Sequence, residues 1–352
     1  MPLLARLLTT PLFVDVRAGA VADLGDLLAD RSISADGRVA IAVGPGQGEQ
    51  IVEQIRPSLA NAYVHVVHAG SLAAADELAE LLRSTHYDAV VGIGGGRTLD
   101  VAKYAARLVA LPMVAVATNL AHDGIASPVS SLEHGGGKGS FGVIPPIAVV
   151  VDLDYVRAAP PRMVRSGIGD TVNNLSAIAD WELAHAERGE HVDGLAVTFA
   201  RVAAEAVLHR TDTITSDAFL TSLAEALVLS GLAMTAAGTS RPSSGADHEI
   251  LHAVDALFPG TSNHGELAGI GALFATRLRG DTVLEADLAA CLVRHELPRT
   301  PLDVGLSQAQ FVAAVLHAPS TRPDRYTILE HLSLSPATAA DAVASFCAAY
   351  AS

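Results

Sequence analysis

The sequence predicts an α/β domain with a parallel sheet over residues 1–158, followed by an all-α domain over residues 159–352. Three observations support this division. The chain has 352 residues, which is long enough for two cores of ordinary size. Short apolar runs alternate with helical periods as far as about residue 154, which is typical of a parallel sheet covered on both faces. After Pro160 and Pro161 the pattern changes to long Ala- and Leu-rich helical periods.

The first half is expected to alternate strands with helices. The strands are short runs of mostly apolar residues, and the helices carry apolar residues three and four positions apart. The glycine-rich run 133–141 is expected at the tip of a hairpin. The expected strands are 39–43, 63–67, 89–93, 113–117 and 147–151, and the expected helices are 47–59, 73–83 and 98–108.

The second half is expected to be helical, with stripes of apolar residues facing a core. Its most apolar period, 219–237, contains Glu225 and several hydroxyl groups, so we expect a buried core helix rather than a membrane span. Because ligands favour clefts between domains, the functional site is expected between the two halves. The expected helices are 171–187, 192–208, 217–237, 246–257, 265–277, 286–294, 307–316 and 337–350.

Composition limits the partners and the location. The formal net charge of −15 argues against nucleic acid and an anionic membrane as main partners. The chain has only two cysteines, Cys291 and Cys347, so a disulfide framework is not expected. This favours the reducing cytoplasm as its location. The N-terminal run Met1 to Pro11 is too brief for a secretory signal. We therefore expect a cytoplasmic protein without membrane insertion, and a homo-oligomer.

Three consecutive glycines, Gly94 to Gly96, follow an apolar strand and precede a helix. Glycines let the backbone approach a diphosphate, and a helix N-terminus supplies free N–H donors. The pattern departs from the usual dinucleotide fingerprint, because Arg97 stands where the last glycine would be. A strand-to-helix turn that needs positive φ explains the glycines equally well. The glycines therefore indicate a Rossmann-like nucleotide site without establishing one.

Polar residues follow at the same edge of the predicted sheet. Asp100 could accept a hydrogen bond from a cofactor, or simply favour the helix start electrostatically. Thr118 and Asn119 close the next strand, and Asp123 and Ser127 follow where nicotinamide and substrate would meet. The alternative for Asp123 is a capping turn in which it bonds backbone amides.

One carboxylate and two imidazoles in the second half are candidates for a divalent-metal site. Asp170 precedes the expected helix from Thr171, where an aspartate alone would be an N-cap. His248 lies near the start of another expected helix, and His264 near the start of the next. This donor set leaves positions open for substrate and fits catalytic Zn²⁺, although Fe²⁺ or Ni²⁺ would accept it too.

A competing motif overlaps this set. The run His248-Glu249-Ile250-Leu251-His252 matches the zinc-protease pattern H-E-x-x-H, with the glutamate as base. The metzincin extension is absent, because Asp255 and Phe258 replace its glycine and histidine, although Glu266 could serve as a downstream ligand. A protease would explain neither the three consecutive glycines nor Asp170, so we favour a metal-assisted dehydrogenase.

At these residues the chain resembles sn-glycerol-1-phosphate dehydrogenases, within the group of iron-type alcohol dehydrogenases and dehydroquinate-synthase-like enzymes. The resemblance covers nearly the whole chain, and its joint spacing is specific. Ala121 departs from it, since Ser or Thr is common at that position. The matching runs are Gly94 to Lys103, Thr118 to Pro128, Gly169-Asp170 with Asn174 and Asp180-Trp181, Ser244 to His252, His264-Gly265 and Arg325 to Leu329.

The resemblance implies a role for each of these residues. Asp123 and His252 would be catalytic and contact the substrate, and Asp170 would lie near it. Asp170, His248 and His264 would bind the metal. Contacts to NAD(P) are implied for Gly94, Gly95, Gly96, Arg97, Thr98, Asp100, Thr118, Asn119, Ala121 and Ser127.

The implied activity is reversible reduction of dihydroxyacetone phosphate, or a similar small polyol or sugar phosphate ketone, by NADH or NADPH, in phospholipid metabolism. The metal would act as a Lewis acid, and His252 or a water would supply the proton. Two alternatives stay open: a sugar-phosphate cyclase or lyase that uses NAD transiently, and a binding protein without catalysis. The basic candidates for the substrate phosphate are Lys138, Arg162, Arg165 and Arg241.

Overall fold

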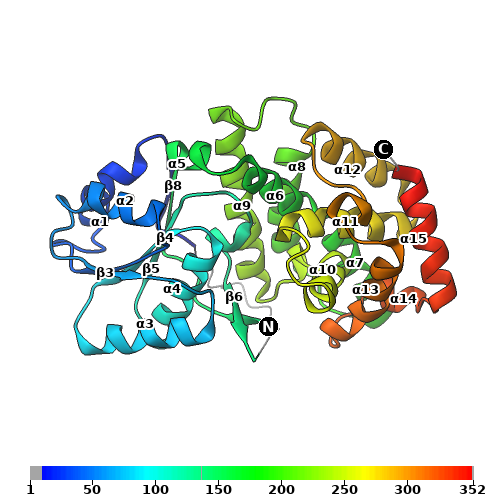
Figure 1. The fold of residues 1–352 in the computed structure, drawn as a ribbon, viewed down its shortest axis with the longest axis horizontal. Coiled ribbons are helices and arrows are strands. Elements are labelled where there is room, and N and C mark those ends of the chain that lie inside the picture. The colour runs from blue at the N-terminus through cyan, green and yellow to red at the C-terminus, as the bar shows by residue number, and fades with distance from the viewer. Residues whose placement is uncertain (1–9, 136, 351–352) are drawn as a thin grey trace, which may run out of the picture. The chain divides into compact units, whose positions relative to one another are not determined.

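The computed structural model describes residues 10–135 and 137–350 (Figure 1). The chain forms two compact units, the first ending at Pro160 and the second beginning at Pro161. The N-terminal run on which we based the absence of a signal peptide lies almost wholly outside the described residues. Residue 136, inside the expected glycine-rich hairpin, also lies outside them.

The first unit is built on a six-stranded, all-parallel sheet with the order β1-β8-β5-β4-β2-β3. The edge strand β1 was missed from the sequence because its side chains alternate between partly buried and exposed, and include Asp15 and Arg17. The strands are β1 Phe13–Arg17, β2 Val39–Val43, β3 Tyr63–Val66, β4 Ala89–Gly94, β5 Met113–Ala117 and β8 Ala148–Asp152.

Helices cover both faces of this sheet (Figure 1). On one face, α1 and α2 pack side chains such as Leu28 and Ile51 onto Ile41 and Val91. On the other face, Gly92 of β4 lets α4 approach, since a Cβ there would lie 2.9 Å from the Cβ of Ala102. The helices are α1 Leu24–Asp30, α2 Gln47–Ile55, α3 Leu72–Ser84, α4 Gly96–Leu108 and α5 Leu153–Ala158.

A separate antiparallel hairpin joins β6 Val129–His134 to β7 Gly137–Gly142. It corresponds to the expected glycine-rich hairpin. Its first strand forms a bridge between Glu133 and Ser71, the residue that caps α3, so the hairpin is attached to the helical layer.

The second unit is helical over its described residues, so the predicted fold class is confirmed. The most apolar helix, α9, is long and apolar enough to cross a membrane by composition, but 61% of its most apolar window is buried, as expected of a core helix. The helices are α6 Pro161–Val172, α7 Asn174–Arg188, α8 Gly194–Leu208, α9 Asp217–Ala237, α10 Ala246–Leu257, α11 His264–Arg279, α12 Thr282–Arg294, α13 Gln308–Thr321, α14 Ile328–Leu332 and α15 Pro336–Tyr350.

The interpretation of Asp170 as a helix N-cap is wrong. Asp170 lies within the last turn of α6, a helix that the sequence did not predict. Two glycines in this helix, Gly167 and Gly169, lower its intrinsic helix propensity by about 1 kcal/mol each. Packing against α11 compensates, and at Gly169 it also requires a residue without a side chain.

Candidate functional site

Asp170, His248 and His264 converge within the second unit. Their nearest ligand atoms all lie within 4.8 Å of one another. The two histidine Nε2 atoms are 3.1 Å apart, and Asp170 Oδ1 is 3.3 Å from His264 Nε2 and 4.0 Å from His248 Nε2. Ligands about 2.0–2.2 Å from a tetrahedral Zn²⁺ are separated by similar distances. The donor set and its spacing therefore fit one divalent ion.

Glycines bring the helices that carry these ligands together. Gly169 precedes Asp170, and Gly265 follows His264. A Cβ on Gly265 would lie 1.7 Å from the backbone oxygen of Ser166, and a Cβ on Gly169 would lie 2.1 Å from the backbone oxygen of Gly265. Because no side chain fits between α6 and α11 at this point, the two backbones place Asp170 beside His264.

Asp247 orients the His248 ring. The Nδ1 atom of His248 lies 2.6 Å from Asp247 Oδ1, and both side chains are almost fully buried. A carboxylate on Nδ1 fixes the tautomer, leaves the Nε2 lone pair for the metal, and makes the imidazole a better ligand. The sequence analysis overlooked this role, although a carboxylate next to a candidate ligand was a usable signal.

Asp180 of α7 fixes the start of α10, which carries His248. Asp180 Oδ2 accepts the Ala246 N–H at 2.8 Å, and Oδ1 accepts the Ile328 N–H at 2.9 Å and the Arg279 guanidinium at 2.7 Å. Burial raises the pKa of Asp180, while Arg279 and these N–H groups act in the opposite direction. The side chain is completely buried, so its role is to hold the helix rather than to react.

His252 lies one turn after His248 on the same face of α10, with ring centroids 6.2 Å apart. Arg322 donates from Nη2 to His252 Nε2 at 3.1 Å. Burial and the charge of Arg322 hold the pKa of His252 well below its usual value. The imidazole is therefore neutral near pH 7, and its Nε2 accepts a hydrogen bond.

The zinc-protease interpretation is wrong. Glu249, which would be the base, is buried and accepts a hydrogen bond from Thr327 Oγ1 at 3.0 Å. Burial and the charge of Glu330 raise the pKa of Glu249 to about 9. The metal-ligand group found among the described residues contains His264 in place of His252.

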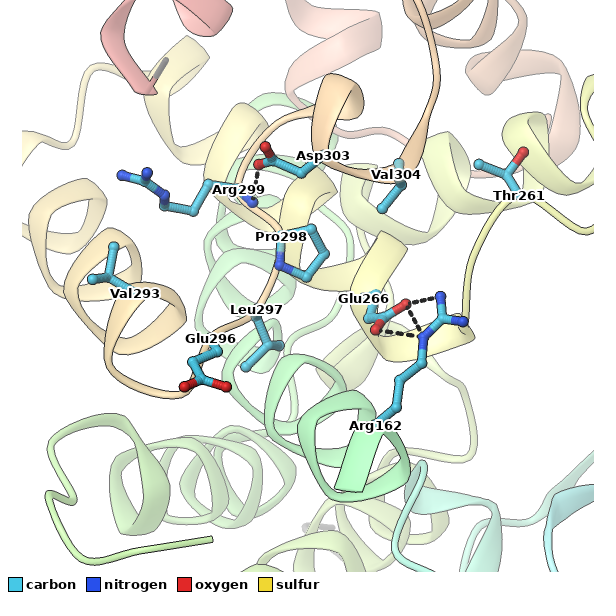
Figure 2. Close-up of a pocket in the computed structure, with 10 residues that line it drawn as sticks. All are labelled: Arg162, Thr261, Glu266, Val293, Glu296, Leu297, Pro298, Arg299, Asp303 and Val304. Carbon is cyan, nitrogen blue, oxygen red and sulfur yellow. Dashed lines mark hydrogen bonds and ion pairs between the residues drawn. The ribbon is translucent and has the colours of Figure 1, made fainter. Parts of the chain in front are cut away.

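Glu266 is also unsuited to be a metal ligand, because Arg162 binds it. Figure 2 shows the Arg162 guanidinium facing both carboxylate oxygens, with Arg162 Nε 2.8 Å from Glu266 Oε1. Burial acts to raise the pKa of Glu266, but hydrogen bonds from Arg162 and Ser262 outweigh it and lower that pKa. This ion pair lines a pocket of about 690 Å³ beside the start of α11.

The expected basic partners of a phosphate have other contacts. Arg162 binds Glu266, Arg165 forms an ion pair with Glu296, and Arg241 forms one with Glu190 through Nε and Oε1 at 2.7 Å. Lys138 lies exposed on the hairpin strand β7. The structure instead brings Arg322 to His252, which local sequence patterns did not indicate.

In the first unit, the glycine run connects β4 to α4 where two neighbouring strands diverge. Strand β2 pairs with β4, with Val43 opposite Ile93, so residues 44–46 lie beside residues 94–96. A Cβ on Gly44 would lie 3.1 Å from Thr98 Oγ1. The chain leaves these strands toward opposite edges of the sheet, which is the place where parallel sheets bind nucleotides.

The glycines also make room for two side chains. A Cβ on Gly95 would lie 2.4 Å from Asn119 Nδ2, and a Cβ on Gly96 would lie 2.1 Å from His122 Nε2. Gly95 is the N-cap of α4 and has no side chain to cap the first-turn N–H groups. This arrangement suits a phosphate, since a helix N-terminus is an anion site.

Asp100 and Lys103 form a buried ion pair with Asp100 Oδ1 3.0 Å from Lys103 Nζ. Lys103 Nζ also donates to the carbonyl of Gly124 at 2.9 Å, and Asp100 Oδ2 accepts the Ser131 N–H at 3.2 Å. The pair thereby ties the segment after β5 to α4. A contact from Asp100 to a cofactor stays a prediction.

The segment after β5 forms a tight turn. His122 caps it, accepting the Gly124 N–H on Nδ1 at 3.0 Å, and the backbone oxygen of Asp123 accepts the N–H groups of Ala126 and Ser127. The capping turn therefore exists, with His122 as the side chain that caps it. Thr118 and Ser127 are both nearly buried at this end of the sheet.

Comparisons with known proteins agree with this geometry. The family model for iron-containing alcohol dehydrogenase matches residues 15–160. Glycerol-1-phosphate dehydrogenase [NAD(P)+] of Methanosarcina acetivorans is 33% identical over 341 residues, covering 95% of this chain and 94% of the relative. The enzyme of the same name from Thermococcus sibiricus is 34% identical over 83% of this chain and 84% of its own.

The chain belongs to the glycerol-1-phosphate dehydrogenase family. The resemblance seen in the motifs is thereby confirmed, and the chain is an NAD(P)-dependent oxidoreductase. Among solved structures, a probable glycerol dehydrogenase from Sinorhizobium meliloti has a TM-score of 0.78 at 21% identity and covers 98% of both chains. Glycerol dehydrogenase from Schizosaccharomyces pombe has the same TM-score at 22% identity, covering 98% of this chain and 91% of its own. At this identity the two structures support the fold alone.

Proposed function

We propose that the protein is a metal-dependent dehydrogenase that reduces dihydroxyacetone phosphate, or a similar small ketone phosphate, with NADH or NADPH. The observation that carries the proposal is the Asp170, His248 and His264 cluster, held by three helices in a member of this family. The residues around it support a metal role, because Asp247 leaves His248 Nε2 facing His264.

The cofactor site we propose is the glycine run with the residues around it. The first-turn N–H groups of α4 would hold the diphosphate, and Asp123 would contact the substrate. We propose cofactor contacts for Gly94, Gly95, Gly96, Arg97, Thr98, Asp100, Thr118, Asn119, Ala121 and Ser127. When bound, the nicotinamide supplies hydride, and a divalent ion, Zn²⁺ in our proposal, polarises the carbonyl as a Lewis acid.

The chain's own contribution to catalysis would be placement of the substrate and proton handling. We propose that His252, or a water beside it, takes the hydroxyl proton when the alcohol is oxidised and returns it in the reverse reaction. Asp170 would lie near the substrate as well as on the metal. The cytoplasmic location and the homo-oligomeric state stay predictions.

The cyclase alternative is weaker than the dehydrogenase. A cyclase would need basic residues for its phosphate, and Arg322 and Arg325 lie in the second unit close to His252. The curated relatives favour the dehydrogenase, because matches that cover 83–95% of this chain carry that name. A lasting fall in NADH or NADPH absorbance with dihydroxyacetone phosphate would support reduction, whereas a cyclase would regenerate its cofactor in every turnover.

The decisive variant is His264→Ala. We expect it to lose bound metal and at least about a hundredfold in turnover, as removal of one catalytic ligand implies, while its circular dichroism stays that of the native chain. Elemental analysis and the absorbance assay measure the two losses separately. Full metal content with a normal rate in this variant would refute the metal centre.

A further inference from the structure

Three arginines gather on the second unit, and two of them, Arg322 and Arg325, lie close enough to His252 to lower its pKa. Arg241 lies in the short helical turn before α10, Arg322 follows α13, and Arg325 precedes α14. The charges of these arginines affect one another, which indicates that they lie close together. Burial first, and then the charges of Arg322 and Arg241, lower the pKa of Arg325 to about 10.

The contacts of these arginines leave positive charge in the cluster. Arg241 is paired with Glu190. Arg325, in contrast, donates to Ser240 Oγ and to the backbone oxygen and Oγ of Ser244, which are uncharged. The charges of Glu249 and Asp247 act on Arg325, but its hydrogen bonds go to uncharged groups, so a further anion beside this buried guanidinium would be stabilised.

The cluster lies next to the candidate metal centre. Arg322 Nη2 is 3.1 Å from His252 Nε2, and His252 is one helical turn from the ligand His248. His248 in turn faces His264 at 3.1 Å. A small molecule bound at the metal and touching His252 would therefore have Arg322 within reach of its other end.

The planar guanidinium of arginine matches the oxygens of a phosphate group, and such charge-assisted pairs are stronger than neutral hydrogen bonds. We propose that Arg322, positioned by His252 and supported by the charge of Arg325, binds the phosphomonoester of the substrate and sets the preference for phosphorylated ketones. The inference rests on the proposed function, because it assumes that the substrate occupies the metal centre. Arg325 is a positioning residue, since its hydrogen bonds already hold Ser240 and Ser244.

Binding of inorganic phosphate to the purified protein tests the anion site without any turnover. By titration calorimetry, we expect Arg322→Met to weaken phosphate binding by about 10- to 100-fold, and Arg322→Lys to weaken it less. The matched control is Arg201→Met, because Arg201 is 46% exposed and lies 3.7 Å from Glu182 on the surface. The control should bind phosphate as the native protein does.

Inhibition distinguishes the substrate phosphate from a cofactor phosphate. We expect inorganic phosphate to compete with dihydroxyacetone phosphate and not with NADH or NADPH. Competition with the cofactor alone would overturn the assignment to substrate. Native-like phosphate affinity in Arg322→Met, with unchanged circular dichroism and metal content, would overturn it as well.

Kinetics with a pair of ketones supplies the second readout. In Arg322→Met we expect KM for dihydroxyacetone phosphate to rise about 10- to 100-fold, and kcat/KM for dihydroxyacetone phosphate to fall by a larger factor than kcat/KM for unphosphorylated dihydroxyacetone. Equal loss on both ketones would contradict a role in phosphate recognition. If the native protein reduces neither ketone, the proposed function fails, while the calorimetric titration still decides whether Arg322 forms an anion site.

Discussion

At the scale of single residues, Glu249 separates the dehydrogenase from the protease pattern that it completes. Its buried carboxyl accepts from Thr327 and carries a proton near pH 7, so glutamine is a close substitute. We expect Glu249→Gln to keep its metal and to change turnover in the reduction assay by less than about tenfold. Loss of a true catalytic base costs about 10²- to 10⁴-fold, and a loss of that size would contradict the structure.

His295 gives a prediction about stability and pH. It is buried at the end of α12 and packs on Phe219 with ring centroids 5.1 Å apart, and burial followed by the charge of Arg294 lowers its pKa. Below about pH 6.5 the unfolded chain therefore takes up a proton that the folded chain resists. The free energy of unfolding must fall as the pH falls through this range, by at most about 1.4 kcal/mol per pH unit.

The variant His295→Asn should remove this part of the pH dependence, since asparagine does not titrate. Urea unfolding between about pH 5 and pH 7.5 measures the slope for each variant. His86→Asn is the control, because the His86 side chain is 79% exposed and should leave the slope as in the native chain. An unchanged slope in His295→Asn would show that another group causes the acid sensitivity.

At the scale of elements, the contact between α6 and α11 decides whether the ligands meet. We expect Gly265→Ala to push the two backbones apart, because its Cβ would lie 1.7 Å from a backbone oxygen. The variant should lose about 1–3 kcal/mol of stability and at least about tenfold in metal affinity. Thermal unfolding and a metal titration measure the two effects.

Two further alanine variants show how the effect depends on the space available for the added Cβ. Gly269→Ala of the same helix would place its Cβ 3.2 Å from the movable Leu292 side chain, so a smaller effect is expected. Gly194→Ala, at the start of α8, meets no atom within 4 Å and should be neutral or slightly stabilising. Equal metal affinity in all three variants would refute the role of the glycine contact.

The same contact explains what the sequence could and could not predict at this scale. The strands β2 and β5 and the helices α9 and α10 were predicted at their observed bounds, because the strands are uninterrupted apolar runs and the helices carry apolar residues at helical spacing. Helix α6 was missed, because its glycines argue against a helix until α11 is in place. Local propensity disfavours a helix there, and tertiary packing outweighs it.

At the scale of the whole molecule, the sequence indicated the metal ligands but not the residues that hold those ligands in place. One carboxylate and two imidazoles near expected helix starts indicated a metal site, and the structure brings them together. Asp180, Arg322 and Arg325 act across long stretches of chain, with Asp180 accepting from Ile328, 148 positions away. No spacing rule connects such residues, so only the folded chain identifies them.

Metal removal should separate the two units functionally. All three proposed ligands belong to the second unit, whereas the glycine run belongs to the first. After treatment with a chelator, we therefore expect turnover to be lost while NADPH binding, followed by its fluorescence, changes by less than about threefold. The melting temperature should fall as well, because an ion present at about 100 times its Kd contributes about 2.7 kcal/mol to the stability of the folded state. Restoring Zn²⁺ should restore both the rate and the melting temperature. Simultaneous loss of NADPH binding would mean that the cofactor site depends on the metal centre, against the assignment of each to its own unit.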